Sequence, residues 1–190
     1  EWTKSMSIGG IPATNFIYAD KTGRIALVYN ALFPDRKPGY DYTRILPGDT
    51  SKDLWNGAVG FDAFPKLVDP ASGFVQNANN APTLAAGPGS EMQLSDWSPL
   101  LGIENGMTNR GIRATELMAA DSSITPEELL AIKFDKSYSR ASWVGAWMAK
   151  FAALDLTNKP DLERGQTLLA SWDWTSASST SCCRTNPAPR

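Results

Sequence analysis

Histidine is absent from this 190-residue sequence, and cysteine occurs only twice. Without histidine, the chain by itself cannot form a Ser-His-Asp triad or a Cys-His pair, and almost every catalytic zinc site is excluded. The two cysteines, Cys182 and Cys183, are adjacent, which suits neither a zinc knuckle nor a Cys-x-x-Cys redox pair. We therefore expect no metal and no cofactor, and any acid–base step needs a group other than histidine.

An excess of charge of one sign is missing as well, and so are long apolar runs. Lysine and arginine total 18 against 20 acidic residues, so the formal net charge of −2 gives no reason to expect nucleic acid or an anionic membrane as a partner. No apolar run approaches the roughly eighteen residues that would span a bilayer, and no charged-then-apolar leader stands at the start. Because the sequence begins at Glu1 rather than methionine, we expect it to be processed or excerpted from a precursor.

The sequence does contain enough apolar material for one folded domain, since 42% of its residues are hydrophobic and seven are tryptophan. Two runs rich in β-branched and aromatic residues, 14–20 and 24–30, flank a Gly-bearing turn and predict a β-hairpin. Residues 33–50 are interrupted by proline and glycine, which predicts a long loop. Tyr40 and Tyr42 on this loop either line a substrate entrance or serve in packing.

Residues 55–82, WNGAVGFDAFPKLVDPASGFVQNANNAP, end in a cluster of four amides: Gln76, Asn77, Asn79 and Asn80. If residues 73–80 form a strand, Asn77 and Asn79 share one face while Asn80 points to the other. An Asn NH2 group held in a dry cleft can donate to a developing oxyanion, a role worth roughly 3 to 4 kcal/mol in acyl-transfer enzymes. The alternative is that these asparagines close a turn before Pro82, because Asn readily bonds nearby backbone.

Helical periodicity begins at about Met107. Thr125, followed by proline and two glutamates, is typical of a second helix start, and Pro160 begins the last predicted helix. The helix between them, from about residue 139, carries an apolar stripe that we expect to be core: Trp143, Trp147, Phe151 and Leu154.

Arg110 and Arg113 lie within or beside the apolar face of the first predicted helix. A guanidinium near a buried face needs partners, because leaving such a charge unpaired costs several kcal/mol. One interpretation is that Arg113 forms an ion pair with Glu116 or with a neighbouring loop carboxylate.

The elements W-N-G, F-P-K-L-V-D-P and S-G-F-V-Q-N-A-N-N-A-P occur in this order and resemble the segment of the penicillin acylase family, within the N-terminal nucleophile hydrolases, that carries the oxyanion-hole asparagine. The third position of N-x-N-N-x-P supplies that residue, which implies a catalytic role for Asn79. The run T-N-R-G-I-R-A-T-E-L-M is similar to a second signature, whose arginine orients the catalytic asparagine and the nucleophile's amine. The resemblance places that role on Arg113, and we expect Tyr40, Trp55 and Asn77 to bind substrate.

The resemblance implies an α+β fold that is part of an N-terminal nucleophile hydrolase αββα sandwich, with a helical segment after residue 107. It covers about residues 9–174, so we expect residues 1–174 to be a section of the acylase β-subunit domain and the Ser/Thr-rich residues 175–190 to be a disordered or aberrant tail. Interior strands of such a section would be left as edges. We therefore expect the chain in isolation to be inactive and only marginally stable.

The activity implied by the resemblance is hydrolysis of the amide bond of N-acylated small amines such as acyl-homoserine lactones, penicillins or acylated peptides. L-G-I-E, M-T-N-R and E-E-L-L-A-I-K-F-D are more similar to the acylases of homoserine lactones and acylated cyclic peptides than to those of aromatic penicillins. The family nucleophile is a serine exposed by autocleavage, whose α-amine is its own general base. Glu1 cannot serve in this way, so we expect the nucleophile upstream, outside this chain.

Partners implied by the family are the small acyl-amide substrate and the remaining α and β segments of the same precursor, in the periplasm or secreted. Two other functional classes stay open. A non-catalytic binding module would use Tyr40, Trp55 and the amides to hold a sugar or a peptide. A degenerate member of the same fold would keep only the structural elements.

Overall fold

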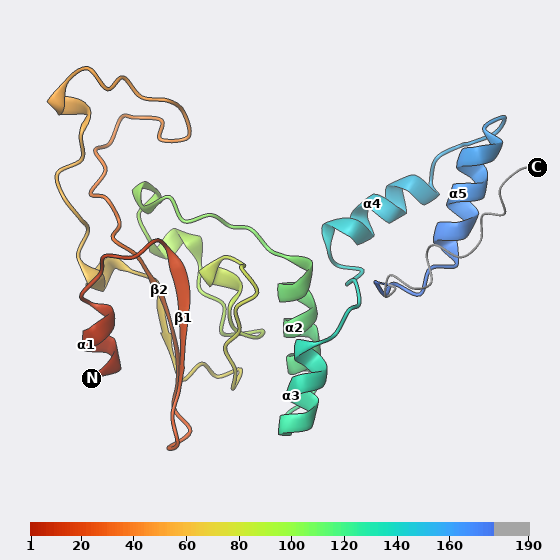
Figure 1. Cartoon of the computed structure of the whole chain (residues 1–190), viewed down its shortest axis with the longest axis horizontal. Helices are drawn as coiled ribbons and strands as arrows, with labels where there is room; N and C mark the ends of the chain where they lie inside the picture. Colours follow the sequence, from red (N-terminus) through yellow and green to blue (C-terminus); the bar gives the residue numbers. More distant parts are fainter. Residues whose placement is uncertain (177–190) are drawn as a thin grey trace, which may run out of the picture.

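A computed structural model describes residues 1–176 as an α+β fold, in which a short helix and a small sheet come first and the longer helices follow (Figure 1). The helices and strands, in chain order, are α1 (Trp2–Met6), β1 (Thr14–Ala19), β2 (Ile25–Asn30), β3 (Lys66–Val68), α2 (Asn109–Ala119), α3 (Pro126–Lys133), α4 (Trp143–Ala152) and α5 (Pro160–Ala170). Five short 3-10 turns occupy Ser51–Asp53, Phe61–Ala63, Pro82–Leu84, Leu94–Asp96 and Pro99–Leu101.

The predicted tail begins at Thr175, and most of it, residues 177–190, lies outside the described residues. The first two residues of that tail are placed. Thr175 forms a β-bridge with Ser137, and the Ser176 amide donates to the carbonyl of Lys136 at 2.9 Å. These two residues therefore pair with the loop that precedes α4.

The predicted hairpin is confirmed. β1 and β2 pair antiparallel with Asn15 opposite Tyr29, and β3 pairs with the other edge of β2. The Asp20 carboxylate closes the turn by accepting from the Thr22 amide at 2.8 Å. The hydroxyl of Thr22 bonds the same carboxylate and is the main reason that the pKa of Asp20 falls to about 2.

The central strand β2 is buried on both faces, so its two sides define two layers. One face holds Leu27, which packs against Ala85 and Met92 from the segment before α2. On the other face the Asn30 side chain donates to the carbonyl of Met6, at the end of α1, at 2.8 Å. The segment 83–106 supplies part of the core, because its residues Ala85 and Met92 pack against β2.

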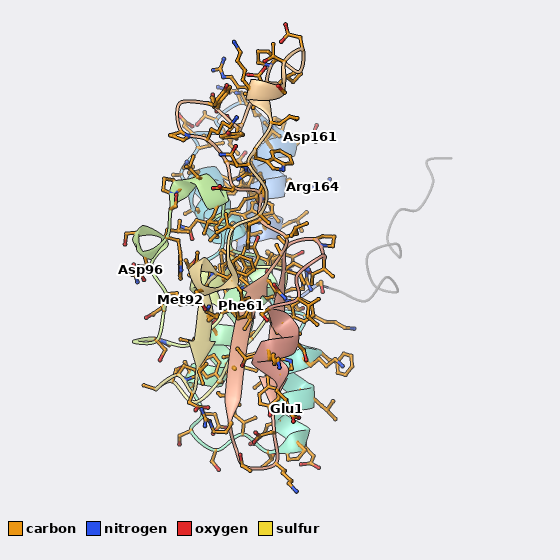
Figure 2. All side chains as sticks on the ribbon, turned by 90° about the vertical axis from the view of Figure 1, so that its left-hand side faces the viewer. Glu1, Phe61, Met92, Asp96, Asp161 and Arg164 are labelled. Atoms are coloured by element: carbon orange, nitrogen blue, oxygen red, sulfur yellow. The ribbon has the colours of Figure 1, made fainter. Side chains whose placement is uncertain are left out.

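A second apolar cluster extends the core beyond the end of β2. It is built from Ala31, Phe33, Phe64 and Leu101, and the rings of Phe33 and Phe64 meet edge to face at 4.8 Å. Figure 2 views this end of the molecule, where Phe61 of this cluster and Met92 of the first lie beside the strands. Val75 and Ala85, which flank the amide-rich segment in the sequence, both pack in the first cluster.

The predicted starts of α2, α3 and α5 are confirmed, but α4 begins at Trp143 rather than at about residue 139. Thr108 caps α2 by accepting from the Gly111 amide, and Thr125 with Glu128 forms a capping box at the start of α3. The expectation that the tryptophan stripe is core is wrong for the described chain: Trp143 is 71% exposed and Trp147 52% exposed. α4 packs against α5, away from the sheet, and neither helix has a buried residue (Figure 1).

None of the helices within residues 1–176 combines the length and the apolar character needed to cross a membrane.

Candidate active site

Residues 77–80 form a turn rather than the end of a strand. The only pairing near this segment is an isolated bridge between Val75 and Ala86, and Asn79 has a left-handed backbone with φ of 60°. The side chain of Asn77 accepts from the Asn79 amide at 3.1 Å, which is an Asx turn. The predicted strand over residues 73–80 is therefore wrong, and the turn alternative describes the backbone. We call residues 77–80 the amide turn.

Asn80 holds the amide turn from within. Its Oδ1 accepts from the Ala78 amide at 2.8 Å, and its Nδ2 donates to the carbonyls of Ala81 at 3.0 Å and Leu84 at 3.2 Å. The residue is only 5% exposed. Asn80 is thus a structural residue, and its burial rather than strand alternation separates its role from that of Asn79.

The N-terminus of α2 docks directly on the amide turn. The Thr108 hydroxyl donates to the Ala78 carbonyl at 2.9 Å while it accepts from the Gly111 amide at 3.0 Å. A Cβ on Gly111 would come within 3.2 Å of Asn80 Oδ1, so this glycine lets the helix approach the turn. The cap that starts α2 therefore also fixes the position of the turn.

The arginine that contacts Asn79 is Arg110. Its Nη2 donates to Asn79 Oδ1 at 2.8 Å. Arg113, which the second signature led us to expect in this place, instead binds Asp135 through Nε at 3.1 Å and Glu116 through Nη1 at 2.9 Å. Arg110, and not Arg113 as expected, therefore contacts Asn79. The interpretation of Arg113 as an ion-pair residue is confirmed.

Helix geometry explains the difference between the two arginines. Three residues advance the chain by roughly 4.5 Å along the helix and turn it to within about 60° of its starting direction. Arg110, in the first turn of α2, therefore reaches the amide turn, whereas Arg113 lies nearly one turn deeper and meets the loop after α3. There the Asp135 carboxylate raises the pKa of Arg113, and the guanidinium lowers the pKa of Asp135.

The loop after α3 is tied to α2 by further polar contacts. Asp135 also accepts from the amide and hydroxyl of Ser137, both at 3.1 Å. Glu116 accepts from the hydroxyl of the buried Ser139, and Asn109 accepts from the Ser139 amide at 2.8 Å. Arg113 is thus part of a network that sets the orientation of α2.

A pocket of about 330 Å³ opens beside the amide turn. Its walls come from β1, β2, the turn and the segment before α2, and its polar lining includes Asn15, Tyr29, Asn77, Asn79 and Glu104. Burial, and then the charge of Glu104, raises the pKa of Tyr29, so its phenol stays protonated at neutral pH. We call this cavity the amide pocket.

The sequence-predicted substrate residues are only partly brought together. Asn77 lines the amide pocket, but its Oδ1 is occupied by the Asn79 amide and by Asn15. Tyr40 donates to Asp53 at 3.0 Å, and Trp55 is 55% exposed. Both lie in the long connection between β2 and β3, coloured orange in Figure 1, and neither lines the amide pocket.

Sequence reasoning missed Asn15 and Thr108 and assigned the orienting role to Arg113 rather than to Arg110. The available signal for Asn15 was an amide at the start of an otherwise apolar strand. A second hollow, of about 810 Å³, separates the amide turn from α3, and it shares Asn77 and Arg110 with the site. Within residues 1–176, no cluster of three or more His, Cys, Asp or Glu side chains is placed to hold a metal ion.

Comparisons with known proteins identify related sequences. The sequence profile of the penicillin amidase family matches residues 1–183. Penicillin G acylase of Escherichia coli is 38% identical over 82 residues, which is 43% of this chain and 10% of that protein. Penicillin acylase 2 proenzyme of Pseudomonas sp. (strain SE83) is 27% identical over 165 residues, which is 86% of this chain and 19% of that protein.

The fold is shared with a solved acylase. Thermostable penicillin G acylase from Alcaligenes faecalis, in its orthorhombic form, superposes with a TM-score of 0.62 at 24% identity, over 90% of this chain and 29% of that one. This match confirms the expected N-terminal nucleophile hydrolase fold, although the chain spans less than a third of each of these relatives. With a profile match over nearly its whole length, the chain belongs to the penicillin amidase family.

Proposed function

We propose that this chain supplies the oxyanion donor of an amidohydrolase that cleaves N-acylated small amines, and that Asn79 is that donor. The observation that carries the proposal is the hydrogen bond from Arg110 to Asn79 Oδ1. A guanidinium can only donate, so the atom that faces it must be the carboxamide oxygen. The NH2 group of Asn79 then points away from Arg110 and remains available to an incoming acceptor.

The charge on Arg110 also makes Asn79 a better donor. A cation bound to the carboxamide oxygen draws electron density from the nitrogen and strengthens the N–H dipoles. The amide turn keeps this group in place through the Asx turn and the buried Asn80. A donor that is oriented before reaction costs little reorganisation when the oxyanion forms, and this is the main way in which oxyanion holes accelerate acyl transfer.

In the proposed reaction, a serine outside this chain attacks the amide carbonyl carbon, and its own α-amine takes the hydroxyl proton. The carbonyl oxygen becomes the oxyanion that Asn79 Nδ2 stabilises. The C–N bond then breaks, the departing nitrogen receives the proton, and water hydrolyses the acyl-serine to a carboxylate. The chain has no histidine, which agrees with a mechanism in which an amine is the base.

The proposed substrates carry an apolar acyl chain, as in acyl-homoserine lactones, acylated peptides or penicillins. The proposed partners are the remaining segments of the same precursor, in the periplasm or outside the cell. Three observations support such partners. Neither α4 nor α5 has a buried residue, and β1 is an edge strand. One relative is itself named a proenzyme.

The test uses an active precursor that contains this chain. Asn79→Ala should lower kcat by about a hundredfold or more with little change in KM, because one oxyanion donor is lost. Amine release from a panel of fatty-acyl and phenylacetyl amides gives both parameters. Turnover at the wild-type rate would refute the role of Asn79. A precursor that binds acyl amides but releases no amine would favour the non-catalytic binding module.

A further inference from the structure

We propose that Asn15, on β1, is a positioning residue for Asn79, an inference that rests on the proposed function. Asn15 lies opposite Tyr29 in the sheet register, so both side chains project from the same face. Both line the amide pocket. The Asn15 Nδ2 group donates to Asn77 Oδ1 at 3.2 Å and to the Asn80 carbonyl at 2.9 Å. One amide thus joins the sheet to both ends of the amide turn.

The contact reaches Asn79 through a shared acceptor. Asn77 Oδ1 accepts from Asn15 and, on the other side, from the backbone amide of Asn79 at 3.1 Å. That bond helps to hold Asn79 in its left-handed conformation, which is uncommon for non-glycine residues although asparagine adopts it more readily than most. Displacing Asn77 therefore displaces the backbone from which the Asn79 carboxamide projects.

The orientation of the Asn15 carboxamide follows from its partners. Both are oxygen atoms, so only the NH2 group can face them. The other end of the group, Oδ1, is buried and has no hydrogen-bond partner among the described residues. A buried acceptor left unpaired opposes folding. The residue is thus suited to donating two hydrogen bonds to the turn, and less suited to stabilising the sheet.

The turn is consequently held from two directions. α2 contacts it through Thr108 and Arg110, and β1 contacts it through Asn15. With Asn15 removed, the α2 contacts remain, but the turn is free to shift relative to the sheet. A displacement of about 1 Å in a catalytic group is enough to cost up to a hundredfold in rate.

Asn30 offers a matched control on the neighbouring strand. It also donates through Nδ2 to a backbone carbonyl, that of Met6, and its Oδ1 is also buried and unpaired among the described residues. It fixes α1 and does not touch the amide turn. Substituting it removes the same kind of interaction from the same hairpin.

The experiment compares Asn15→Ala, the isosteric Asn15→Asp and Asn30→Ala in an active precursor that contains this chain. We expect both Asn15 variants to lose about tenfold or more in kcat with KM changed less than twofold, and Asn30→Ala to keep wild-type kcat at a comparable loss of melting temperature. In the Asn79→Ala background, Asn15→Asp should cost little further rate, because the group that it positions is gone. Equal loss of kcat in Asn30→Ala, or unchanged kcat in both Asn15 variants, would overturn the proposal.

Hydrogen exchange at the backbone amide of Asn79 tests this inference independently of the proposed function. In the same precursor, Asn15→Asp should speed hydrogen exchange at that amide by about tenfold, while Asn30→Ala should leave it unchanged. If the wild-type precursor releases no amine, the proposed function fails, and this measurement alone decides whether Asn15 holds the turn. Unchanged exchange in Asn15→Asp would then refute the contact itself.

Discussion

Replacing Arg110 and Arg113 one at a time tests the central assignment, because the two arginines are three residues apart on α2 and make different contacts. Arg110→Ala removes the donor that holds Asn79 Oδ1 and leaves the carboxamide free to rotate. Arg113→Ala removes ion pairs to Asp135 and Glu116, and Arg113 lines the larger hollow between the turn and α3 but not the amide pocket. We expect the first substitution to act on rate and the second on stability.

The expected losses of stability follow from how exposed the two arginine contacts are. The bond between Arg110 and Asn79 lies at the surface, so its loss should cost stability only about 0.5 kcal/mol. The Arg110→Ala variant keeps Asn79 but no longer orients its carboxamide. Its kcat should therefore fall by about tenfold, less than the hundredfold or more expected when the donor itself is lost. The side chains of Arg113 and Asp135 are 23% and 20% exposed, and breaking this partly buried pair should cost on the order of 1–3 kcal/mol. That is a fall of roughly 2–12 °C in Tm.

The assay is kcat and KM for an acyl amide, together with a thermal melt, for each variant of an active precursor. Arg110→Lys is a useful third variant, because a lysine keeps the charge but not the planar fork and should restore part of the rate. The reasoning would be refuted if Arg113→Ala lost turnover at an unchanged Tm while Arg110→Ala kept it. That result would return the orienting role to the residue that the sequence signature indicated.

Two further predictions concern the same helix. The pKa of Asp135 is lowered chiefly by its hydrogen bond with Arg113, so the stability from this pair is present above the ordinary carboxyl pKa of about 4 and is lost as the pH falls through the lowered pKa. Melts between pH 6 and pH 2 should show this loss in the wild-type chain and less of it in Arg113→Ala. Gly111→Ala should push α2 away from Asn80, lowering both Tm and kcat, and a crystal structure with the helix unmoved would contradict this.

Local patterns predicted the local elements. The Gly-bearing turn identified the hairpin because the carboxylate of Asp20 and the backbone after it suffice to close it. The capping box identified the start of α3 because it too is formed by residues close in sequence, Thr125 and Glu128. Asn79 was found through a motif whose spacing is unusual enough to be informative.

Contacts between distant segments were not predictable in the same way. Whether Arg110 or Arg113 faces Asn79 depends on how α2 is rotated against the turn, and that rotation is set by carboxylates elsewhere in the chain. The strand expected over residues 73–80 failed because asparagine side chains there compete for the backbone hydrogen bonds that a strand would use. The exposure of Trp143 could not be predicted from the sequence either, because an apolar stripe does not show which segment covers it.

The two-sided attachment of the amide turn has a consequence for the order of folding. The bond from Asn15 to Asn80 joins residues 65 positions apart, and that from Arg110 to Asn79 joins residues 31 apart. Such closures are slow compared with the formation of a hairpin or of a single helix. The hairpin and α2 should therefore form first, and the carboxamide of Asn79 should become fixed only when the two meet. Acquisition of the proposed activity would then lag behind the appearance of secondary structure.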